Sequence, residues 1–247
     1  MSIETTSNFV IFAAGVGSRL GRDVPKFITT VLDRPLCDWT LPQIAALGGR
    51  ITIVCGHRAD RVVQCVTRWH DAAKPPGRTC QFVYNGDYRG PQSLSILSAL
   101  RCIDRTVPTY FIDGDLIMST KVLRSMMDPH RSVALVRVEL TSDPVLTHYD
   151  GDALRAFSRP PVPPQSDGNR EWANIIRYQP REMERLYAIA QRRSLNHHYE
   201  MINQCVDEGA TFKLVSGELD EIDNEVDLQN VERKLSGGTM PPRDCDG

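Results

Sequence analysis

The sequence of 247 residues lacks any apolar run long enough to cross a membrane, and it lacks an excess of charge of one sign. The N-terminal segment MSIETTSNFVIF contains an acidic residue and no basic region, so it does not match a secretory signal peptide. With 29 basic and 31 acidic residues, the net charge of −2 implies no general attraction to nucleic acid or to an anionic membrane surface. We therefore expect a cytoplasmic protein with neither a nucleic acid nor a membrane as partner, in which any anion binding is local.

Cysteine spacing in the sequence shows no pairing pattern. The seven cysteines are odd in number and occur singly, three of them within apolar runs. This distribution favours reduced thiols over disulfide bridges or a zinc site.

Common catalytic and phosphate-binding motifs are also absent. The Gly-Lys-Ser/Thr end of a Walker A loop does not occur, and in GVGSRL a leucine, Leu20, stands where a dinucleotide fingerprint has its third glycine. We find no Ser/His/Asp or Cys/His arrangement, and His197 and His198, which have helical neighbours, are expected to face solvent. The sequence therefore does not predict nucleophilic catalysis by a side chain.

Strand-like and helix-like segments alternate in the first half of the chain. Strands are predicted at 8–14, 50–56, 80–85 and 109–115, and helices at 35–49, 58–69 and 93–103. This alternation is typical of βα units that build a mainly parallel sheet. We expect an α/β fold with three αβα layers around a Rossmann-like mixed sheet.

The second half continues the pattern less regularly. Strands are predicted at 130–140, in a hairpin around Asp150-Gly151, from 173 onward and at 211–217, with helices at 180–193, 197–209 and 224–235. The Pro-rich stretch 159–172 is predicted to be a surface loop, and residues 237–247 a disordered tail. A mass of 27.7 kDa favours a single domain over residues 1–236, with halves at about 1–115 and 116–236.

The stretch FAAGVGSRLGRDVPKF follows the first predicted strand. Its glycines allow a tight turn whose N–H groups can approach a ligand, and such amides favour phosphate groups. Arg19 and Lys26 add full positive charges. The loop therefore suits a polyphosphate, although a Gly-rich turn without a ligand is the alternative explanation for a lone G-x-G.

Three segments carry a resemblance to a known family. AAGVGSRLGRDVPKF resembles the signature loop of nucleotidyltransferases that join an NTP to a phosphorylated small molecule and release pyrophosphate. YFIDGDLIM resembles the strand that ends in that family's metal-binding Asp, and DEIDNEVDLQNVE its late acidic segment. The segments occur in the family's order from about Phe9 to Glu232, and they imply the fold of nucleotide-diphospho-sugar transferases.

The resemblance implies a role for each matching residue. The loop would wrap the triphosphate and approach the base, and Arg19 and Lys26 would be catalytic through their charge. Asp115 and Asp223 would hold Mg²⁺, with Asp113 beside them; a solvated turn and a helix N-cap are the alternative explanations for these carboxylates. The nucleotide-binding residues would be Ala13, Ala14, Gly15, Val16, Gly17, Ser18, Arg19, Lys26, Gln92, Ser95 and Asp113.

The nucleotide is predicted from one further segment. NGDYRGPQSLSILSAL resembles the corresponding part of small bacterial phosphocholine and phosphonate cytidylyltransferases, in which Gln92 and Ser95 fall at base-contacting or ribose-contacting positions. The resemblance favours CTP. The chain departs from that family at Pro91-Gln92, which replaces a pair of asparagines.

The acceptor is expected to bind the second half of the chain. The resemblance places Arg159 near the acceptor phosphate, with Glu171, Trp172 and Arg177 nearby. Trp172 and Glu171 could enclose an ammonium group, and packing of Trp172 under the Pro-rich loop is the alternative. Phosphoamines, aminophosphonates, polyol phosphates and sugar phosphates all remain open.

The predicted activity is a Mg²⁺-dependent transfer of CMP from CTP to a phosphorylated or phosphonate small molecule. The acceptor oxygen would attack the α-phosphorus in line, and because it is already anionic near neutral pH it needs no general base. Two alternatives stay open: a sugar-1-phosphate nucleotidyltransferase that uses UTP or dTTP, and a non-catalytic nucleotide-binding module. A homodimer is also considered.

Overall fold

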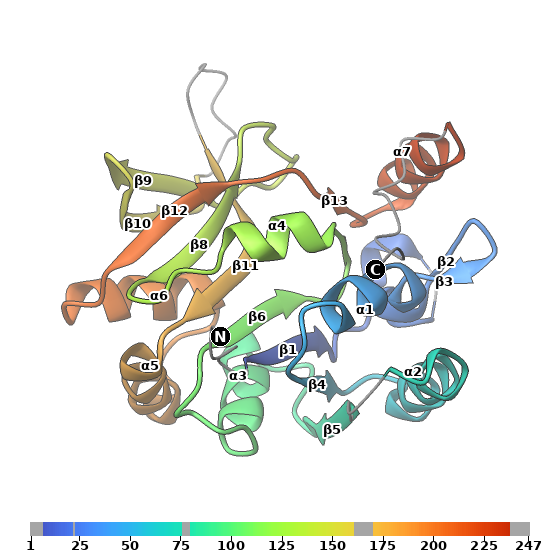
Figure 1. Cartoon of the computed structure of the whole chain (residues 1–247), viewed down its shortest axis with the longest axis horizontal. Coiled ribbons are helices and arrows are strands. Elements are labelled where there is room, and N and C mark those ends of the chain that lie inside the picture. The colour runs from blue at the N-terminus through green and yellow to red at the C-terminus, as the bar shows by residue number, and fades with distance from the viewer. Residues whose placement is uncertain (1–6, 22, 76–79, 161–169, 238–247) are drawn as a thin grey trace, which may run out of the picture.

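Nine strands form the central sheet of the computed structural model, which describes residues 7–21, 23–75, 80–160 and 170–237 (Figure 1). The strands are β1 (Asn8–Ala13), β4 (Arg50–Cys55), β5 (Cys80–Tyr84), β6 (Thr109–Asp113), β8 (Ser132–Arg137), β9 (Leu146–Asp150), β10 (Ala153–Ser158), β11 (Glu171–Tyr178) and β12 (Phe212–Ser216). Their spatial order is β5-β4-β1-β6-β11-β8-β12-β10-β9. The first four strands in this order are parallel, and β11 is antiparallel to both of its neighbours, β6 and β8. The sheet is therefore mixed.

Helices cover both faces of this sheet. On one face lie α1 (Cys37–Ala45), α2 (Ala59–Ala73), α4 (Thr120–Ser125) and α7 (Glu225–Ser236), and on the other α3 (Gln92–Leu100), α5 (Pro180–Arg192) and α6 (His198–Asp207). Side chains of β1 alternate between the two cores: Phe9 and Ile11 pack into the first, and Val10 packs into the second. The predicted three-layer αβα fold is confirmed.

The connections around β1 create a crevice. The chain moves from β1 to β4 and β5 through α1 and α2 on one face, and returns through α3 on the opposite face to β6. Right-handed crossovers require this change of face when the direction of strand addition reverses. Ligands of open α/β sheets bind at such a switch point, outside the carboxyl ends of the strands.

The sequence analysis did not predict several short elements, because segments of two to six residues are too short to show a period of apolar residues. They are α4, the strand pairs β2 (Thr30–Val31) with β3 (Arg34–Pro35) and β7 (Leu116–Ile117) with β13 (Asp220–Glu221), and the 3₁₀ turns η1 (Ser18–Leu20) and η2 (Lys26–Ile28). The predicted hairpin is confirmed, with Gly151 at φ +59° between β9 and β10. The pair of β7 and β13 proves important for the site.

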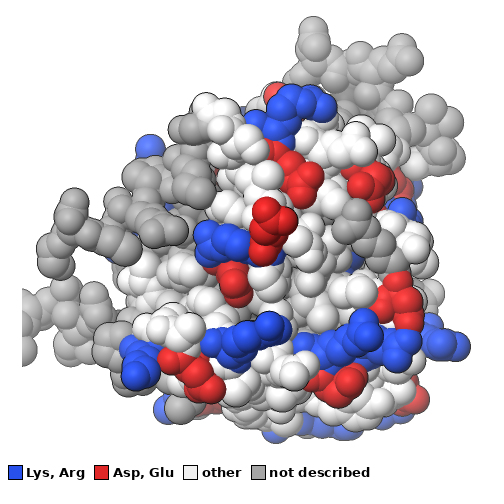
Figure 2. Space-filling view, turned by 90° about the vertical axis from the view of Figure 1, so that its right-hand side faces the viewer, with Lys and Arg blue, Asp and Glu red and all other residues white. Residues whose placement is uncertain are grey.

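The predicted surface loop at 159–172 and the predicted tail at 237–247 lie mostly outside the described residues. Within the described part of the chain, each helix is too short or too polar to cross a bilayer. Figure 2 shows Lys and Arg interspersed with Asp and Glu on one side of the molecule, in keeping with the near-zero net charge.

Candidate functional site

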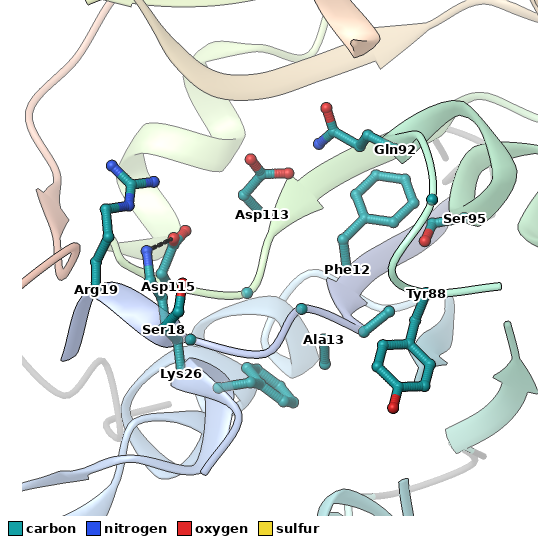
Figure 3. A pocket seen from close by; sticks show the side chains of 16 residues that line it. Phe12, Ala13, Ser18, Arg19, Lys26, Tyr88, Gln92, Ser95, Asp113 and Asp115 are labelled. Atoms are coloured by element: carbon teal, nitrogen blue, oxygen red, sulfur yellow. Dashed lines mark hydrogen bonds and ion pairs between the residues drawn. The ribbon is translucent and has the colours of Figure 1, made fainter. Parts of the chain in front are cut away.

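A cavity of about 320 Å³ opens at the switch point, where β1 and β6 end. Every residue that lines it falls between Phe12 and Asp115 in the chain. Arg19, Lys26 and Asp115 lie toward one end, and Tyr88, Gln92 and Ser95 toward the other (Figure 3). The cavity therefore has a charged end and an end that bears an aromatic ring and neutral polar groups.

The glycine loop after β1 forms one wall of this cavity. Gly17 has φ +69°, and a Cβ at this position would come within 2.9 Å of the carbonyl oxygen of Val24. Only glycine avoids both the left-handed strain and this close approach. Of the predicted loop residues, Val16 alone is not part of the lining, which contains Ala13, Ala14, Gly15, Gly17, Ser18 and Arg19.

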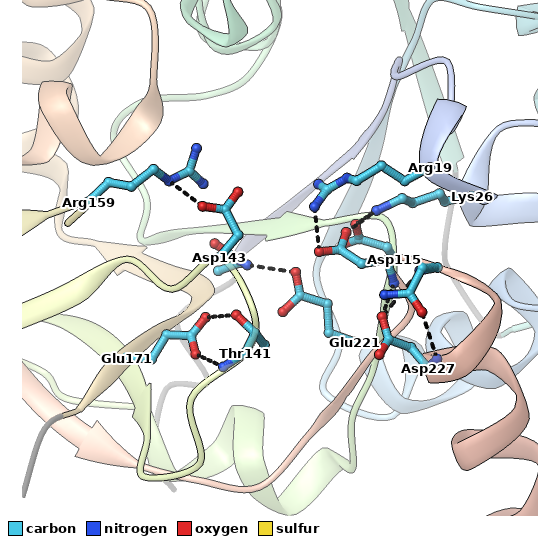
Figure 4. Close-up of polar contacts among 12 residues, drawn as sticks. Arg19, Lys26, Asp115, Thr141, Asp143, Arg159, Glu171, Glu221 and Asp227 are labelled. Atoms are coloured by element: carbon cyan, nitrogen blue, oxygen red, sulfur yellow. Dashed lines mark hydrogen bonds and ion pairs between the residues drawn. The ribbon is translucent and has the colours of Figure 1, made fainter. Parts of the chain in front are cut away.

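Lys26 lies at the charged end of the cavity, where the 3₁₀ turn η2 begins. Its Nζ donates to Asp115 Oδ2 at 2.8 Å and also contacts Asp223. Burial disfavours the charged ammonium, but the two carboxylates outweigh burial, so that the pKa of Lys26 is raised. Arg19 Nη1 donates to the other oxygen of Asp223 at 2.9 Å (Figure 4). Two cations thus converge on two carboxylates.

Three carboxylates, those of Asp115, Glu221 and Asp223, form a cluster in which one oxygen of each lies within 4.8 Å of the others. One of these oxygens, Asp115 Oδ1, is buried and has no hydrogen-bond partner among the described residues. A hard divalent cation such as Mg²⁺ prefers carboxylate oxygens, and it would satisfy this buried atom. The donor set therefore fits a divalent cation.

The pair of β7 and β13 brings these carboxylates together. Glu221 is paired with Leu116, and the N–H of Ile222 donates to the carbonyl oxygen of Asp115 at 3.0 Å. Asp223 is not the N-cap of α7, because Asn224 caps that helix with its side chain. The alternative explanation of Asp223 as a cap is wrong.

Glu221 was not predicted; it is the last residue of β13 and lies two residues before Asp223 in the chain. Burial, followed by the charge of Asp115, raises the pKa of Glu221 to about 7, against the opposing effect of Arg137. Burial and the neighbouring carboxylates also raise the pKa of Asp113 well above its usual value. Such crowding of like charge is typical of functional sites.

A smaller cavity of about 120 Å³ adjoins the first. Four residues line both cavities, namely Arg19, Gln92, Asp113 and Asp115. The rest of its lining comes from after residue 140 and includes Thr141, Asp143, Arg159, Glu171, Glu221 and Asp223. The residues shared by both cavities therefore mark the place where two ligands could meet.

The predicted acceptor residues at this smaller cavity make different contacts. Arg159 is partly exposed and pairs with Asp143 at 3.3 Å. Glu171 is buried and accepts hydrogen bonds from Arg137 and Thr141. Trp172 is 3% exposed, and its ring stacks on Phe157 at a centroid distance of 5.3 Å.

The proposed ammonium enclosure by Glu171 and Trp172 is not supported. Successive residues of β11 point to opposite faces of the sheet, and the indole N–H of Trp172 donates to the carbonyl of Ile175 at 3.2 Å. Trp172 touches the cavity wall, but its ring belongs to the core. Packing, the alternative explanation, describes this tryptophan.

Arg177 does not reach either cavity. It lies at the opposite end of β11, where it is paired with Tyr110 at the start of β6, and its guanidinium donates to the carbonyl of Asp128 at 2.7 Å. The sequence placed it near Glu171 because the two are close in the chain, whereas six residues of extended strand separate them by roughly 20 Å. The prediction that Arg177 contacts the acceptor is therefore wrong.

The two adjacent histidines differ in their surroundings. His197 is exposed and lines the smaller cavity, whereas His198 is 1% exposed, which contradicts the prediction that it faces solvent. Burial lowers the pKa of His198 to about 3, so that its ring is neutral at physiological pH. His198 Nε2 lies 3.1 Å from the hydroxyl of Tyr178, with which it shares a hydrogen bond.

Gln92 and Ser95, which the sequence predicts to contact the base or the ribose, line the end of the larger cavity away from Lys26. The side-chain oxygen of Gln92 accepts from the backbone N–H of His198 at 3.1 Å, and among the described residues its NH₂ group has no hydrogen-bond partner. Ser95 Oγ accepts from Asn85 Nδ2 at 2.9 Å. Tyr88, which was not predicted, lies beside them as a ring on which a base could stack (Figure 3).

Comparison with known protein families gives a match over more than half of the chain. The model of the MobA-like NTP transferase domain matches residues 9–179. Among curated proteins, the bifunctional protein GlmU of Bordetella petrii is 43% identical over 56 residues, which are 22% of this chain and 12% of that protein. GlmU of Cupriavidus taiwanensis is 32% identical over 114 residues, 46% of this chain and 23% of that protein. The matched segments thus span less than a quarter of these relatives.

Solved structures resemble the chain over nearly its whole length. The inositol-1-phosphate CTP transferase from T. maritima has a TM-score of 0.76 at 14% identity, covering 94% of this chain and 96% of that one. The CTP:phosphocholine cytidylyltransferase LicC from Streptococcus pneumoniae gives 0.71 at 17%, with coverages of 93% and 99%. A UDP-glucose pyrophosphorylase complexed with UDP-glucose gives 0.73 at 13%, with coverages of 94% and 99%. At these identities the likeness shows a common fold.

Proposed function

The chain belongs to the family of MobA-like NTP transferase domains, and from this premise we propose that it is a Mg²⁺-dependent cytidylyltransferase. It would transfer CMP from CTP to a phosphorylated or phosphonate small molecule and release pyrophosphate. The first half of the chain, about 1–115, would bind the nucleotide, and the second half, about 116–236, the acceptor. The lining of the larger cavity supports this division, because it ends at Asp115.

The observation that carries the proposal is the meeting of the two cavities. Arg19, Asp113 and Asp115 line both, directly beside Lys26 and the carboxylate cluster. A nucleotide in the larger cavity, with its phosphates at the charged end, would present its α-phosphate to the smaller cavity. An acceptor oxygen there could attack from the side opposite to the leaving pyrophosphate, as in-line displacement requires.

The chain's own residues would act by alignment and charge neutralisation. The ammonium of Lys26 and the guanidinium of Arg19 would neutralise negative charge that develops on the phosphates. The backbone of the glycine loop would hold the triphosphate, because Gly17 permits the turn. Asp115, Glu221 and Asp223 would hold the magnesium ion, which when bound supplies positive charge to the phosphate oxygens.

The choice of CTP rests on the neutral end of the larger cavity. The NH₂ group of Gln92 offers a donor, which suits the N3 or O2 acceptor of cytosine, and Tyr88 offers a stacking surface. Two of the structural neighbours are named as CTP enzymes, which supports the proposal. UTP with a sugar 1-phosphate is the second candidate, favoured by the UDP-glucose pyrophosphorylase neighbour and by the O2 and O4 acceptors of uracil.

The acceptor class follows from the charges of the smaller cavity. Arg159 lies at one side and could bind a phosphate or phosphonate group. Glu171 and Glu221 are already paired with Arg137, but the half-exposed carboxylate of Asp143 lies beside Arg159 and could bind an ammonium group of the same acceptor. We therefore place phosphoamines and aminophosphonates before polyol and sugar phosphates.

The test is a pyrophosphate-release assay with Mg²⁺ that crosses the four common NTPs with a panel of acceptors. The panel contains phosphocholine, phosphoethanolamine, 2-aminoethylphosphonate, glycerol and inositol phosphates and sugar 1-phosphates. Release with CTP and an amine-bearing acceptor supports the proposal. Release with UTP or dTTP and a sugar phosphate assigns the protein to the second candidate.

The test variant is Asp115→Asn, which removes a proposed cation ligand at nearly constant volume, and the control is Asp150→Asn. Turnover should fall roughly 100-fold or more, whereas Asp150→Asn in the β9–β10 hairpin should retain it. Another outcome is that a nucleotide binds while no combination of NTP and acceptor releases pyrophosphate. In that case the catalytic proposal fails for this panel, and the non-catalytic alternative gains support.

A further inference from the structure

Arg137, the last residue of β8, contacts two carboxylates that belong to different parts of the site. Its Nη2 donates to Glu171 Oε1 at 2.9 Å and also to Glu221 Oε2. The three side chains are 10%, 3% and 11% exposed, respectively. A buried guanidinium therefore joins a carboxylate of the cation-binding cluster to one on the wall of the smaller cavity.

Glu221 is held from a second direction by Asn174. Asn174 Nδ2 donates to Glu221 Oε1 at 3.2 Å (Figure 4), so both oxygens of this carboxylate are engaged. Asn174 has φ +56°, within the part of β11 where its pairing with β8 is interrupted between Trp172 and Ile176. Bulges of this kind re-aim a side chain next to active sites. Here the irregular backbone directs an amide at Glu221.

Glu171 extends the same network to the loop that follows β8. Its carboxylate accepts from the N–H of Thr141 at 2.7 Å and from Thr141 Oγ1 at 2.8 Å (Figure 4). Thr141 and Glu171 both line the smaller cavity. A continuous path of hydrogen bonds therefore runs from Thr141 through Glu171 and Arg137 to Glu221.

We propose that Arg137 is a positioning residue, which fixes Glu221 for cation binding and links its position to the acceptor wall through Glu171. The inference deepens the proposed function and rests on it for the identity of the acceptor. One nitrogen, Nη2, contacts both carboxylates, and a lysine side chain is one atom shorter, so its ammonium would not reach the same point. Glu171 does not belong to the cation-binding cluster, and hydrogen bonds through Arg137 connect it to Glu221, which does.

The experiment measures Mn²⁺ affinity, with CTP present and absent, by electron paramagnetic resonance and calorimetry. Arg137→Lys and Glu171→Gln should each weaken Mn²⁺ binding by roughly 10- to 100-fold, as loss of an outer partner of a metal ligand does. In the double variant the two effects should not multiply, because both break the same path. Glu171→Gln keeps the shape of the side chain and decides the question if Arg137→Lys does not fold.

The matched control is Arg177→Lys, which changes a buried arginine of β11 at the other end of the sheet. It should leave Mn²⁺ affinity within twofold of the unmodified protein. The proposal is overturned if Glu171→Gln binds Mn²⁺ as tightly as the unmodified protein, or if Arg177→Lys weakens it equally. Because Mn²⁺ binding needs no turnover, failure of this inference is separate from silence in the pyrophosphate assay.

Discussion

The larger cavity and the smaller cavity, which we propose as the nucleotide side and the acceptor side of the site, are built in different ways. The nucleotide side comes largely from one continuous stretch, from Ala13 to Lys26, whose shape depends on backbone conformation at Gly17. The acceptor side is assembled from β11, α6, β13, the loop after β8 and Arg159, which follows β10, and buried ion pairs hold it together. Local backbone geometry thus specifies one side, and long-range side-chain contacts specify the other.

The charged end of the nucleotide side should be the most sensitive to change. Lys26→Met removes the ammonium between Asp115 and Asp223, and turnover should fall roughly 100-fold or more because charge on the phosphates is no longer neutralised. The two carboxylates would then repel each other, so Mg²⁺ should raise the melting temperature of this variant more than that of the unmodified protein. Steady-state kinetics and thermal unfolding with and without Mg²⁺ check both outcomes; unchanged turnover removes Lys26 from the mechanism.

The glycine loop should respond to a single methyl group. Gly17→Ala adds a Cβ at φ +69° and 2.9 Å from a carbonyl oxygen, which costs about 1–2 kcal/mol and should raise the KM for the nucleotide roughly tenfold. The matched control is Gly151→Ala, at φ +59° with open space around the added Cβ. Both variants should lose some stability. Equal KM values for the two would show that the loop conformation does not govern nucleotide binding.

His198 lies next to Gln92, a residue that lines both cavities, and its backbone N–H donates to the side chain of Gln92. Its pKa of about 3 lies below the value of about 6.5 in an unfolded chain, so the unfolded state binds more protons between these values. The free energy of unfolding should therefore decrease as pH falls below 6.5, by about 1.4 kcal/mol at pH 5.5 from this residue. Urea unfolding measures the difference in the free energy of unfolding between pH 7.5 and pH 5.5. This difference should be smaller in His198→Phe than in the unmodified protein, and unchanged in His130→Phe, a control at an exposed site.

The acceptor side should respond least to a single exposed change. Arg159→Ala should raise the KM of the acceptor roughly fivefold while the KM of the nucleotide changes less, because a partly exposed charge contributes modestly. Arg155→Ala, which alters an exposed arginine of β10 four residues earlier, should change neither value. Equal increases for acceptor and nucleotide would show that Arg159 is not an acceptor contact and would weaken the division into two sides.

Much of the nucleotide side could be predicted because its signals are local. Gly17, Arg19 and Lys26 lie within ten residues of each other in the chain, and all three line one cavity. The strand that ends at Asp113 could be predicted because a short apolar run precedes Asp113 and Asp115. These features depend on backbone sterics and on the period of apolar residues, which a sequence displays directly.

The acceptor side could not be predicted to the same extent, because residues that are close in the chain there do not lie at the same cavity. Arg177 and Trp172 are near Glu171 in sequence, but the direction and pleat of β11 place one at the far end of the sheet and the other's ring in the core. Arg137 and Asp143 carry no recognisable motif. Their importance appears only when β8, β11 and β13 lie together.

The sequence by itself determined the alternating elements, the glycine loop and the residue types that can bind phosphate and a divalent cation. The resemblance of its segments implied that Asp115 and Asp223 share a cation, whereas only the tertiary structure showed that Glu221 lies with them. Asp115 and Asp223 are far apart in the chain, and they meet because β13 pairs with β7 through backbone hydrogen bonds that any residue can make. For that reason the pairing leaves almost no signal in the sequence, although it assembles the cation-binding cluster.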